Sequence, residues 1–374
     1  MTKPQQETNT LRRASTNLVS LIVSQLVVII LGLLLTMVIA RELGTAVYGQ
    51  YVIALSFANL FGFGIELGIP RIITRFVARD PESGGRVIVN SLLIYFTTII
   101  PMSLIVLFIS MILQYDDQII VLIMATWLSN FTTGLFNVYR MHLHGLQKMV
   151  VDSGLQVLQF TLMAGGGILA LNLGYGILGV IVVSFLSSLF TLGIAHIYAS
   201  RQQVNIQLGE IDPAFARLIV TTALPLTLGA VFHAFYLRAD AIILSLFESE
   251  QVVGEYGAAY GLIVQIAQLA LMINMAFFPI IAQRWDKGVQ ETVAFANRTL
   301  LYITLIGIPI GVGLLSVAPE LIAFIFGPEF IASVPLLQIL SFRLFFSFTS
   351  SHLGMIATAI DRQRWIMIAT AIGA

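Results

Sequence analysis

The chain has 374 residues, of which 58% are hydrophobic and 10% are charged, with 19 Lys and Arg against 19 Asp and Glu. A water-soluble domain normally carries about 25% charged residues, so the composition excludes an ordinary soluble protein. The chain contains no cysteine, which excludes disulfides and thiol chemistry.

Apolar stretches recur along the chain, each close to the length of about 20 residues that a helix needs to cross a bilayer. The predicted spans are 17–40, 51–73, 87–113, 119–139, 154–171, 177–199, 218–237, 257–281, 299–317 and 336–357. An eleventh span begins near Trp365 and stops with the chain at Ala374. We therefore expect an all-α polytopic membrane protein with ten full spans, the start of an eleventh, and its last spans missing.

The N-terminal residues 1–16 are expected to form a cytoplasmic tail. Arg12 and Arg13 precede the first apolar run, as basic residues do in a signal peptide. However, the run exceeds the signal-peptide core of about 7–15 residues, and it lacks a small-residue cleavage site. We interpret it as a retained first span.

Positive charges lie almost entirely on alternate connecting segments. With a cytoplasmic N-terminus, 16 of the 19 Lys and Arg fall on the cytoplasmic side, the exceptions being Arg41, Arg238 and Arg343. The opposite segments 114–118 and 318–335 contain acids but no Lys or Arg. Cytoplasmic loops carry an excess of Lys and Arg, so we predict a cytoplasmic N-terminus in a bacterial-type cytoplasmic membrane.

No catalytic or nucleotide-binding motif accompanies these spans. The sequence lacks a P-loop, a Gly-x-Gly-x-x-Gly after a strand, and a His-Glu-x-x-His motif. The longest loop, 200–217, is too short for a nucleotide-binding domain. We expect no enzyme activity, no cofactor and no nucleic-acid partner. His142 and His144 do not have the pattern of metal ligands, so no metal site is expected.

Two stretches related by a constant offset indicate an internal repeat. Segment 48–54 opens the second span, segment 253–259 opens the eighth, and their Gly, Tyr and Ala residues align at an offset of 205 residues. Pro101 and Pro309 align at an offset of 208. Parallel repeats are one arrangement known in transporters. We therefore expect a first six-helix half at 17–199, a cytoplasmic linker at 200–217 and an incomplete second half at 218–374.

Four segments, in order along the chain, resemble signatures of the polysaccharide biosynthesis flippases, which belong to the multidrug/oligosaccharidyl-lipid/polysaccharide (MOP) exporter superfamily. They are 41–51; 63–69 followed by Arg71 and Arg75; 238–245 running into 253–256; and 320–330 with 336–340 after it. Two features depart from the family pattern. Residue 66 is Glu where Asp is more usual, and the last spans are missing.

The resemblance implies a MATE-like flippase fold and a function. Such proteins move a polyprenyl-diphosphate-linked oligosaccharide from the cytoplasmic to the outer leaflet by alternating access, with ion coupling as an option. The partners implied are that glycan, membrane lipid and the polysaccharide polymerase or ligase machinery, and a monomer is sufficient. Two alternatives stay open. One is a multidrug or organic-cation exporter of the related branch, and the other is a membrane glycosyltransferase or ligase of the same pathway.

Ionisable residues inside spans are costly in hydrocarbon, so each is a candidate site residue. Arg343 lies deepest, and a guanidinium binds phosphate oxygens bidentately; snorkelling or pairing with a carboxylate is the alternative. Arg71 and Arg75 lie four apart and share one helix face. They are candidates to meet the diphosphate, or anchors at the headgroups. Arg238 and Asp240 form either an outer gate or a local ion pair.

Two further ionisable residues are candidates for ion coupling. Glu66 is the only acid that we place within a span, and it is either a proton-coupling residue or a salt-bridge partner of Arg71, Arg75 or Arg343. His233 titrates near neutral pH when unperturbed, although a lone intramembrane histidine also serves simply as a hydrogen-bonded packing residue.

Four glutamines form two pairs at a spacing of three residues, Gln156 with Gln159 and Gln265 with Gln268. Each pair shares a helix face. We expect these side chains to line the path of the glycan, although polar residues also bind neighbouring helices in membranes.

Overall fold

The computed structural model describes residues 3–66, 68–202, 204, 206–360 and 362. Every regular element in that part of the chain is helical, which confirms the predicted all-α class. The long helices are α1 (Lys3–Phe61), α3 (Ile69–Arg79), α4 (Gly84–Ile112), α5 (Asp117–Gly145), α6 (Met149–Asn172), α7 (Gly176–Arg201), α8 (Pro213–Phe247), α9 (Glu250–Trp285), α10 (Val289–Ile325) and α11 (Ser333–Ala359), with a short α2 at Phe63–Glu66. The predicted eleventh span lies outside the described residues.

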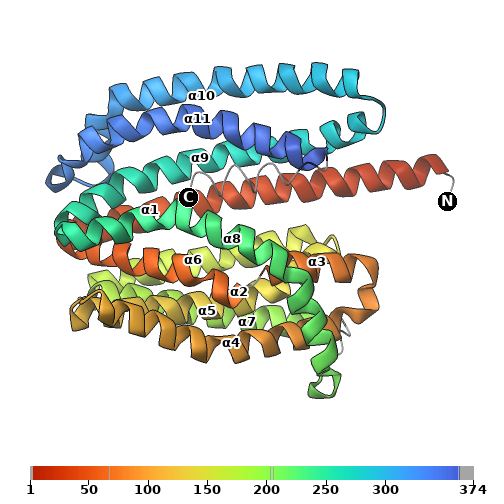
Figure 1. Cartoon of the computed structure of the whole chain (residues 1–374), viewed down its shortest axis with the longest axis horizontal. Helices are drawn as coiled ribbons and strands as arrows, with labels where there is room; N and C mark the ends of the chain where they lie inside the picture. Colours follow the sequence, from red (N-terminus) through yellow and green to blue (C-terminus); the bar gives the residue numbers. More distant parts are fainter. Residues whose placement is uncertain (1–2, 67, 203, 205, 361, 363–374) are drawn as a thin grey trace. The chain divides into compact units, whose positions relative to one another are not determined.

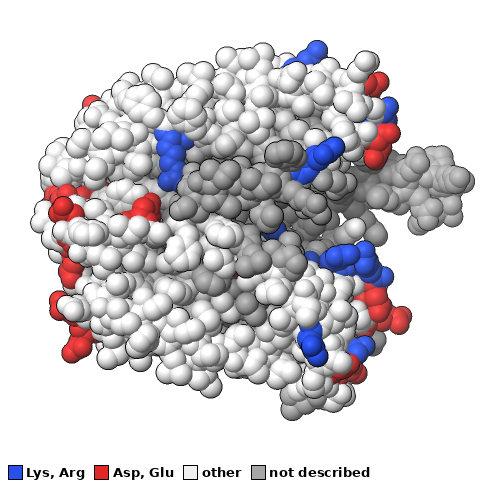
Figure 2. Space-filling model, viewed as in Figure 1, with Lys and Arg blue, Asp and Glu red and all other residues white. Residues whose placement is uncertain are grey.

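Among the described residues, eight helices are long and apolar enough to cross a membrane. One of them, Val19–Phe61, has 43 residues and includes most of the first predicted span and part of the second. Figure 2 shows most charged side chains near the ends of the helices, with largely uncharged flanks between them. The protein is therefore a multi-pass membrane protein, while the count of ten spans and the orientation stay predictions.

The chain divides into two compact units. Unit 1 comprises Met1–Glu42 and Gln50–Phe247, and unit 2 comprises Leu43–Gly49 and Glu248–Ala374. This division follows packing, so it places α8 in unit 1. The division into repeated halves at 200–217 rests on sequence offsets and stays a prediction.

Helix α5 is central to unit 1, where it packs against α3, α4, α6 and α7 (Figure 1). Trp127 of α5 is 1% exposed and donates a hydrogen bond from Nε1 to Ser103 Oγ of α4 at 2.8 Å. Helix α3 has alternating faces. Ile69, Ile72, Ile73 and Val77 are buried, so Arg71 and Arg75 lie on the exposed face.

Unit 2 combines α9, α10 and α11 with a seven-residue piece of α1. The helix of α1 is kinked at Gly44, whose φ of 74° suits glycine. Beyond the kink, Gly49 lies directly against α9: a Cβ there would be 1.8 Å from the Glu250 carbonyl oxygen. A Cβ on Gly254 would likewise be 2.1 Å from the Thr45 oxygen. The two glycines at the repeat offset of 205 therefore allow two helix backbones to touch.

The predicted second span, 51–73, is wrong as a single continuous helix. Helix α1 ends at Phe61, α2 covers only Phe63–Glu66, and α3 begins at Ile69. Gly68 has a φ of 66°, a left-handed conformation that ends helices, and Pro70 stands at the start of α3. Glu66 therefore lies at a helix break, and its place within a span stays a prediction.

Candidate functional site

A polar cluster in unit 1 joins α2, α5 and α6 beside this break. We call it the Arg140 cluster; its members are Glu66, Asn137, Arg140, His144, Asp152 and Gln156. Sequence reasoning had singled out Glu66 and Gln156 as site candidates. It had assigned Arg140 to a cytoplasmic loop and had considered His144 only as a metal ligand.

The centre of the cluster is an ion pair between α5 and α6. Arg140 Nε donates to Asp152 Oδ1 at 2.6 Å, and Nη2 approaches Oδ2 at 3.3 Å. The Asp152 side chain is 0% exposed and that of Arg140 is 15% exposed. His144 Nε2 lies 2.8 Å from Asp152 Oδ2. Both oxygens of one buried carboxylate are therefore engaged by basic side chains.

The remaining guanidinium hydrogens reach two amides. Arg140 Nη1 donates to Asn137 Oδ1 at 3.0 Å. With its amide oxygen turned to the guanidinium, Gln156 accepts from Nη2 at 2.6 Å and from Nη1 at 3.2 Å. Asn137 Nδ2 in turn lies 3.5 Å from Glu66 Oε1. Arg140 is thus held from several sides, and Asn137 links it to Glu66 at the helix break.

This arrangement is suited to holding charge rather than to capturing a phosphate. A guanidinium has five N–H donors, and those of Arg140 already face Asp152, Asn137 and Gln156. An incoming phosphate would have to displace a buried ion pair. The groups that can change charge without such displacement are Glu66 and His144.

Gln159 has a different role from Gln156, its neighbour one turn away. It is buried and donates from Nε2 to Ser188 Oγ of α7 at 2.8 Å, and Ser188 is 2.9 Å from Thr133 Oγ1 of α5. Gln159 therefore connects three helices, as polar residues commonly do in membranes.

The remaining candidates of unit 1 lie on α3 and α8. Arg71 and Arg75 are exposed on α3, and Asp240 Oδ1 accepts from the Ala241 backbone N–H at 2.8 Å. The side chains of His233 and Arg238 on α8 lie outside the described part of the chain. The Arg71, Arg75 and Arg238 roles stay predictions.

Unit 2 places Arg343 in a half-buried position on α11. Its guanidinium carbon lies 5.1 Å from the ring centre of Tyr260 on α9, within the range of a cation–π contact. Tyr260 is stacked on Tyr256, with ring centres 5.6 Å apart. Gln265 and Gln268 are half-buried on the same helix.

Unit 2 contains a buried polar cluster of its own, which the sequence did not predict. His352 Nδ1 lies 2.7 Å from Asn274 Oδ1, and its Nε2 lies 2.9 Å from Thr299 Oγ1. Asn274 Nδ2 donates to Ser351 Oγ at 2.7 Å. We call this the His352 cluster. Nothing in the sequence marks Asn274 and His352 as partners.

Parts of three of the four segments that carry the family resemblance meet in unit 2. Tyr48 packs edge-on against Phe330, with ring centres 5.7 Å apart, and also faces Phe326. Ser333 Oγ donates to the Glu255 carbonyl at 2.8 Å. Segments far apart in sequence therefore share one packed region around the touching glycines Gly49 and Gly254.

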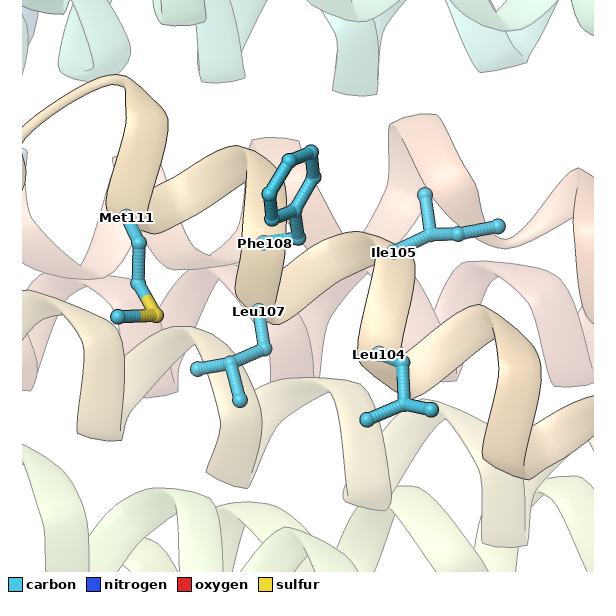
Figure 3. Close-up of a pocket in the computed structure, with 5 residues that line it drawn as sticks. All are labelled: Leu104, Ile105, Leu107, Phe108 and Met111. Atoms are coloured by element: carbon cyan, nitrogen blue, oxygen red, sulfur yellow. The ribbon is translucent and has the colours of Figure 1, made fainter.

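The described chain also has a shallow apolar pocket, which lies along α4 (Figure 3). Its lining consists of Leu104, Ile105, Leu107, Phe108 and Met111. Side chains of this kind suit contact with hydrocarbon rather than recognition of a charged headgroup. Within the described residues, no three His, Asp or Glu side chains gather in a way that could hold a metal ion.

The sequence matches a model of the family described as polysaccharide biosynthesis protein over residues 15–285, most of the chain. The chain belongs to the polysaccharide biosynthesis protein family. This confirms the resemblance read from the sequence motifs.

Two curated relatives match this family member over shorter stretches. Teichuronic acid biosynthesis protein TuaB of Bacillus subtilis is 27% identical over 103 residues, which is 27% of this chain and 21% of that protein. An uncharacterized membrane protein of Methanocaldococcus jannaschii is 25% identical over 114 residues, 30% of this chain and 22% of that protein. The chain thus spans about a fifth of the length of the curated relatives it matches.

Solved structures show which fold the chain has. The lipid II flippase MurJ in an inward closed conformation superposes with a TM-score of 0.74 at 14% identity, over 94% of this chain and 78% of that one. An inward-facing multidrug resistance MATE transporter of the MOP superfamily gives a TM-score of 0.69 at 18% identity, over 91% and 83%. The fold is therefore like that of these two solved structures, which confirms the predicted MATE-like fold.

Proposed function

We propose that this protein flips a polyprenyl-diphosphate-linked oligosaccharide from the cytoplasmic to the outer leaflet for surface polysaccharide biosynthesis. The observation that carries the proposal is the family match over residues 15–285. The MurJ-like fold supports it, because that neighbour is a lipid II flippase. The protein acts by alternating access of two halves, with its N-terminus in the cytoplasm and without catalysing a covalent reaction.

Within this function, Arg343 contacts the diphosphate or an anionic sugar. A guanidinium recognises phosphate oxygens through paired hydrogen bonds. Support for the assignment comes from the half-buried position of Arg343 and from Tyr260, whose ring holds the guanidinium within 5.1 Å. Gln265 and Gln268, half-buried on the same unit, are proposed to contact the glycan.

The test uses a strain that lacks the gene for this protein. Lipid extracts are assayed for a polyprenyl-diphosphate oligosaccharide that accumulates on the cytoplasmic side, and wild type, Arg343→Ala and Arg298→Ala are returned on plasmids. Arg298 is exposed on α10 and serves as the matched control. Accumulation that wild type and Arg298→Ala clear, but Arg343→Ala does not, is the expected result.

Other outcomes change specific parts of the proposal. If Arg343→Ala clears the lipid as well as wild type, flipping stands and the role of Arg343 is wrong. If no lipid accumulates and surface glycan is unchanged, flipping is wrong. The MATE-type fold then favours the second candidate function, export of small organic cations.

A further inference from the structure

The charges of the Arg140 cluster do not balance. Glu66 and Asp152 supply two carboxylates, Arg140 supplies one guanidinium, and His144 is positive only when protonated. With both acids ionised and His144 neutral, the cluster carries one net negative charge. An uncompensated charge beside a buried ion pair is disfavoured because burial weakens its solvation, and binding a proton removes that charge. One added proton makes this cluster neutral.

The geometry limits where that proton can reside. Asp152 is fully buried, and both of its oxygens face basic groups, so it is the carboxylate that stays ionised. Glu66 has only the distant Asn137 amide at 3.5 Å and is exposed. The His144 side chain is 23% exposed. The two groups that can accept a proton thus lie at opposite ends of the cluster, and both reach its surface.

Arg86 of α4 pairs with Asp212, and Arg217 of α8 is exposed. Among the described side chains, the other titratable and charged groups on the packed elements do not supply the missing charge either. They are Tyr95 of α4, Tyr139 and His142 of α5, Lys148 of the α5–α6 turn, His196 of α7, and Arg71 and Arg75 of α3. Tyr139 OH pairs with His196 Nδ1 at 2.9 Å, and Lys148 Nζ donates to Gln202 Oε1 at 2.9 Å. Burial favours the neutral forms of the other tyrosine and histidine. The two α3 arginines lie on the exposed face of that helix.

We propose that the Arg140 cluster is a binding site for one exchangeable proton, carried by the Glu66 carboxylate or by the His144 imidazole while the Arg140–Asp152 pair stays intact. The proton comes from water and returns to water. On Glu66 it forms an O–H bond and removes the charge at the break between α2 and α3. On His144 it forms an N–H bond, and Glu66 keeps its charge. The site of the proton therefore determines whether the helix break is charged.

The test counts protons and needs no lipid-linked sugar, so its result is independent of the proposed flipping. Purified protein in lipid nanodiscs is shifted from about pH 8 to about pH 5, the range in which histidine ordinarily titrates. A pH-sensitive dye in unbuffered solution reports the protons bound. Glu66→Gln leaves a cluster that is neutral without a proton, so it should bind about one proton fewer per molecule than wild type, as expected for groups that titrate as a unit.

Three more variants sharpen the test. His144→Gln should keep the proton, because Glu66 remains to accept it. Glu66→Asp should also keep the proton. If Glu66→Gln fails to fold, the proton uptake of Glu66→Asp tests the proposal instead. Glu82→Gln changes an exposed glutamate outside the cluster and should bind as many protons as wild type. Equal uptake by wild type and folded Glu66→Gln would overturn the proposal, as would loss of the proton in Glu66→Asp.

Discussion

Units 1 and 2 each hold a histidine among polar side chains on neighbouring helices, yet the two clusters differ in charge. The Arg140 cluster contains two carboxylates and a guanidinium, whereas the His352 cluster consists of Asn274, Thr299, Ser351 and the histidine itself. In the His352 cluster, each ring nitrogen has a neutral partner. The polar groups of such a cluster can satisfy one another's hydrogen bonds without any charge. The comparison indicates that unit 2 uses polar side chains to fix helix packing, while unit 1 uses them to hold charge.

Among the variants that test this difference, Asp152→Ala should have the largest effect on stability. The change leaves the Arg140 guanidinium buried without its carboxylate, and breaking a buried pair in this way costs about 3–5 kcal/mol. We expect the free energy of unfolding in detergent micelles, measured by denaturant titration, to fall by that amount. Asp116→Ala, at an exposed position before α5 with no side-chain cap hydrogen bond, should change it by less than about 0.5 kcal/mol. If Asp152→Ala lowers the free energy of unfolding by less than about 1 kcal/mol, the Arg140–Asp152 pair is hydrated rather than buried.

Unit 2 should depend more on close backbone contact than on ions. In Gly254→Ala the new Cβ would meet the Thr45 carbonyl oxygen at 2.1 Å, so the helices must separate, and overpacking of this kind costs about 1–3 kcal/mol. Gly261→Ala on the same helix has nothing within 4 Å of its Cβ. It should stabilise α9 by up to about 1 kcal/mol through helix propensity. The midpoint of thermal unfolding, followed by circular dichroism, should therefore shift in opposite directions for the two variants. A shift in the same direction would contradict the close contact between Gly254 and Thr45.

The neutral cluster should respond less strongly than the ion pair. Asn274→Ala removes the acceptor of the His352 Nδ1 hydrogen and leaves a buried donor unpaired, at about 1–3 kcal/mol. Asn297→Ala, exposed on α10, is the control. The same micelle titration compares it with Asp152→Ala. An Asn274→Ala effect equal to or larger than that of Asp152→Ala would reverse our contrast between the units.

The smallest expected effect is that of an exposed ion pair in unit 1. Arg86 contacts Asp212, which precedes α8, and this hydrogen bond, with the Phe215 and Ala214 backbone N–H groups, holds the pKa of Asp212 below its usual 3.8. A lowered pKa in the folded state stabilises the protein above the usual value, and the contribution is lost as the pH falls through the lowered one. Asp212→Asn should therefore lower the unfolding midpoint at neutral pH, and the difference should shrink at about pH 3.

The pH dependence can be assigned to the pair by changing the other partner. Arg86→Gln should show the same loss at neutral pH and the same convergence in acid. A difference that persists unchanged at low pH would mean that Asp212 acts only as a helix cap. The effect of this exposed pair on stability is the small reference value with which the effect of the buried Arg140–Asp152 pair can be compared.

The sequence predicted the helical class and the membrane setting because apolar length alone determines them. It did not predict the break near Glu66. The apolar run from 51 to 73 was interpreted as one helix. It contains Gly62, Gly64, Gly68 and Pro70, which together are a signal for a helix break. Family membership was predicted from motif order rather than from any single residue.

The Arg140 cluster could not be predicted from spacing along one helix. Arg140 and Asp152 lie on different helices, and they meet because α5 and α6 fold back at the turn around Leu146. Residues roughly equidistant from such a turn face each other, so a helical hairpin with an arginine before it and an aspartate after it is a usable signal. The His352 cluster joins α9, α10 and α11, and no local pattern could have shown it.

The interruption between α1 and α3 has a consequence for hydration. Main-chain amides and carbonyls that leave a helix need partners, and in hydrocarbon each unpartnered group costs several kcal/mol. Irregular backbone persists at membrane depth only where it is enclosed by protein or lines a water-filled cavity. The break falls near the middle of the predicted second span. We therefore expect water to reach Glu66 deep in the bilayer, and the main-chain amides flanking the break to exchange with deuterium faster than those in the middle of α5.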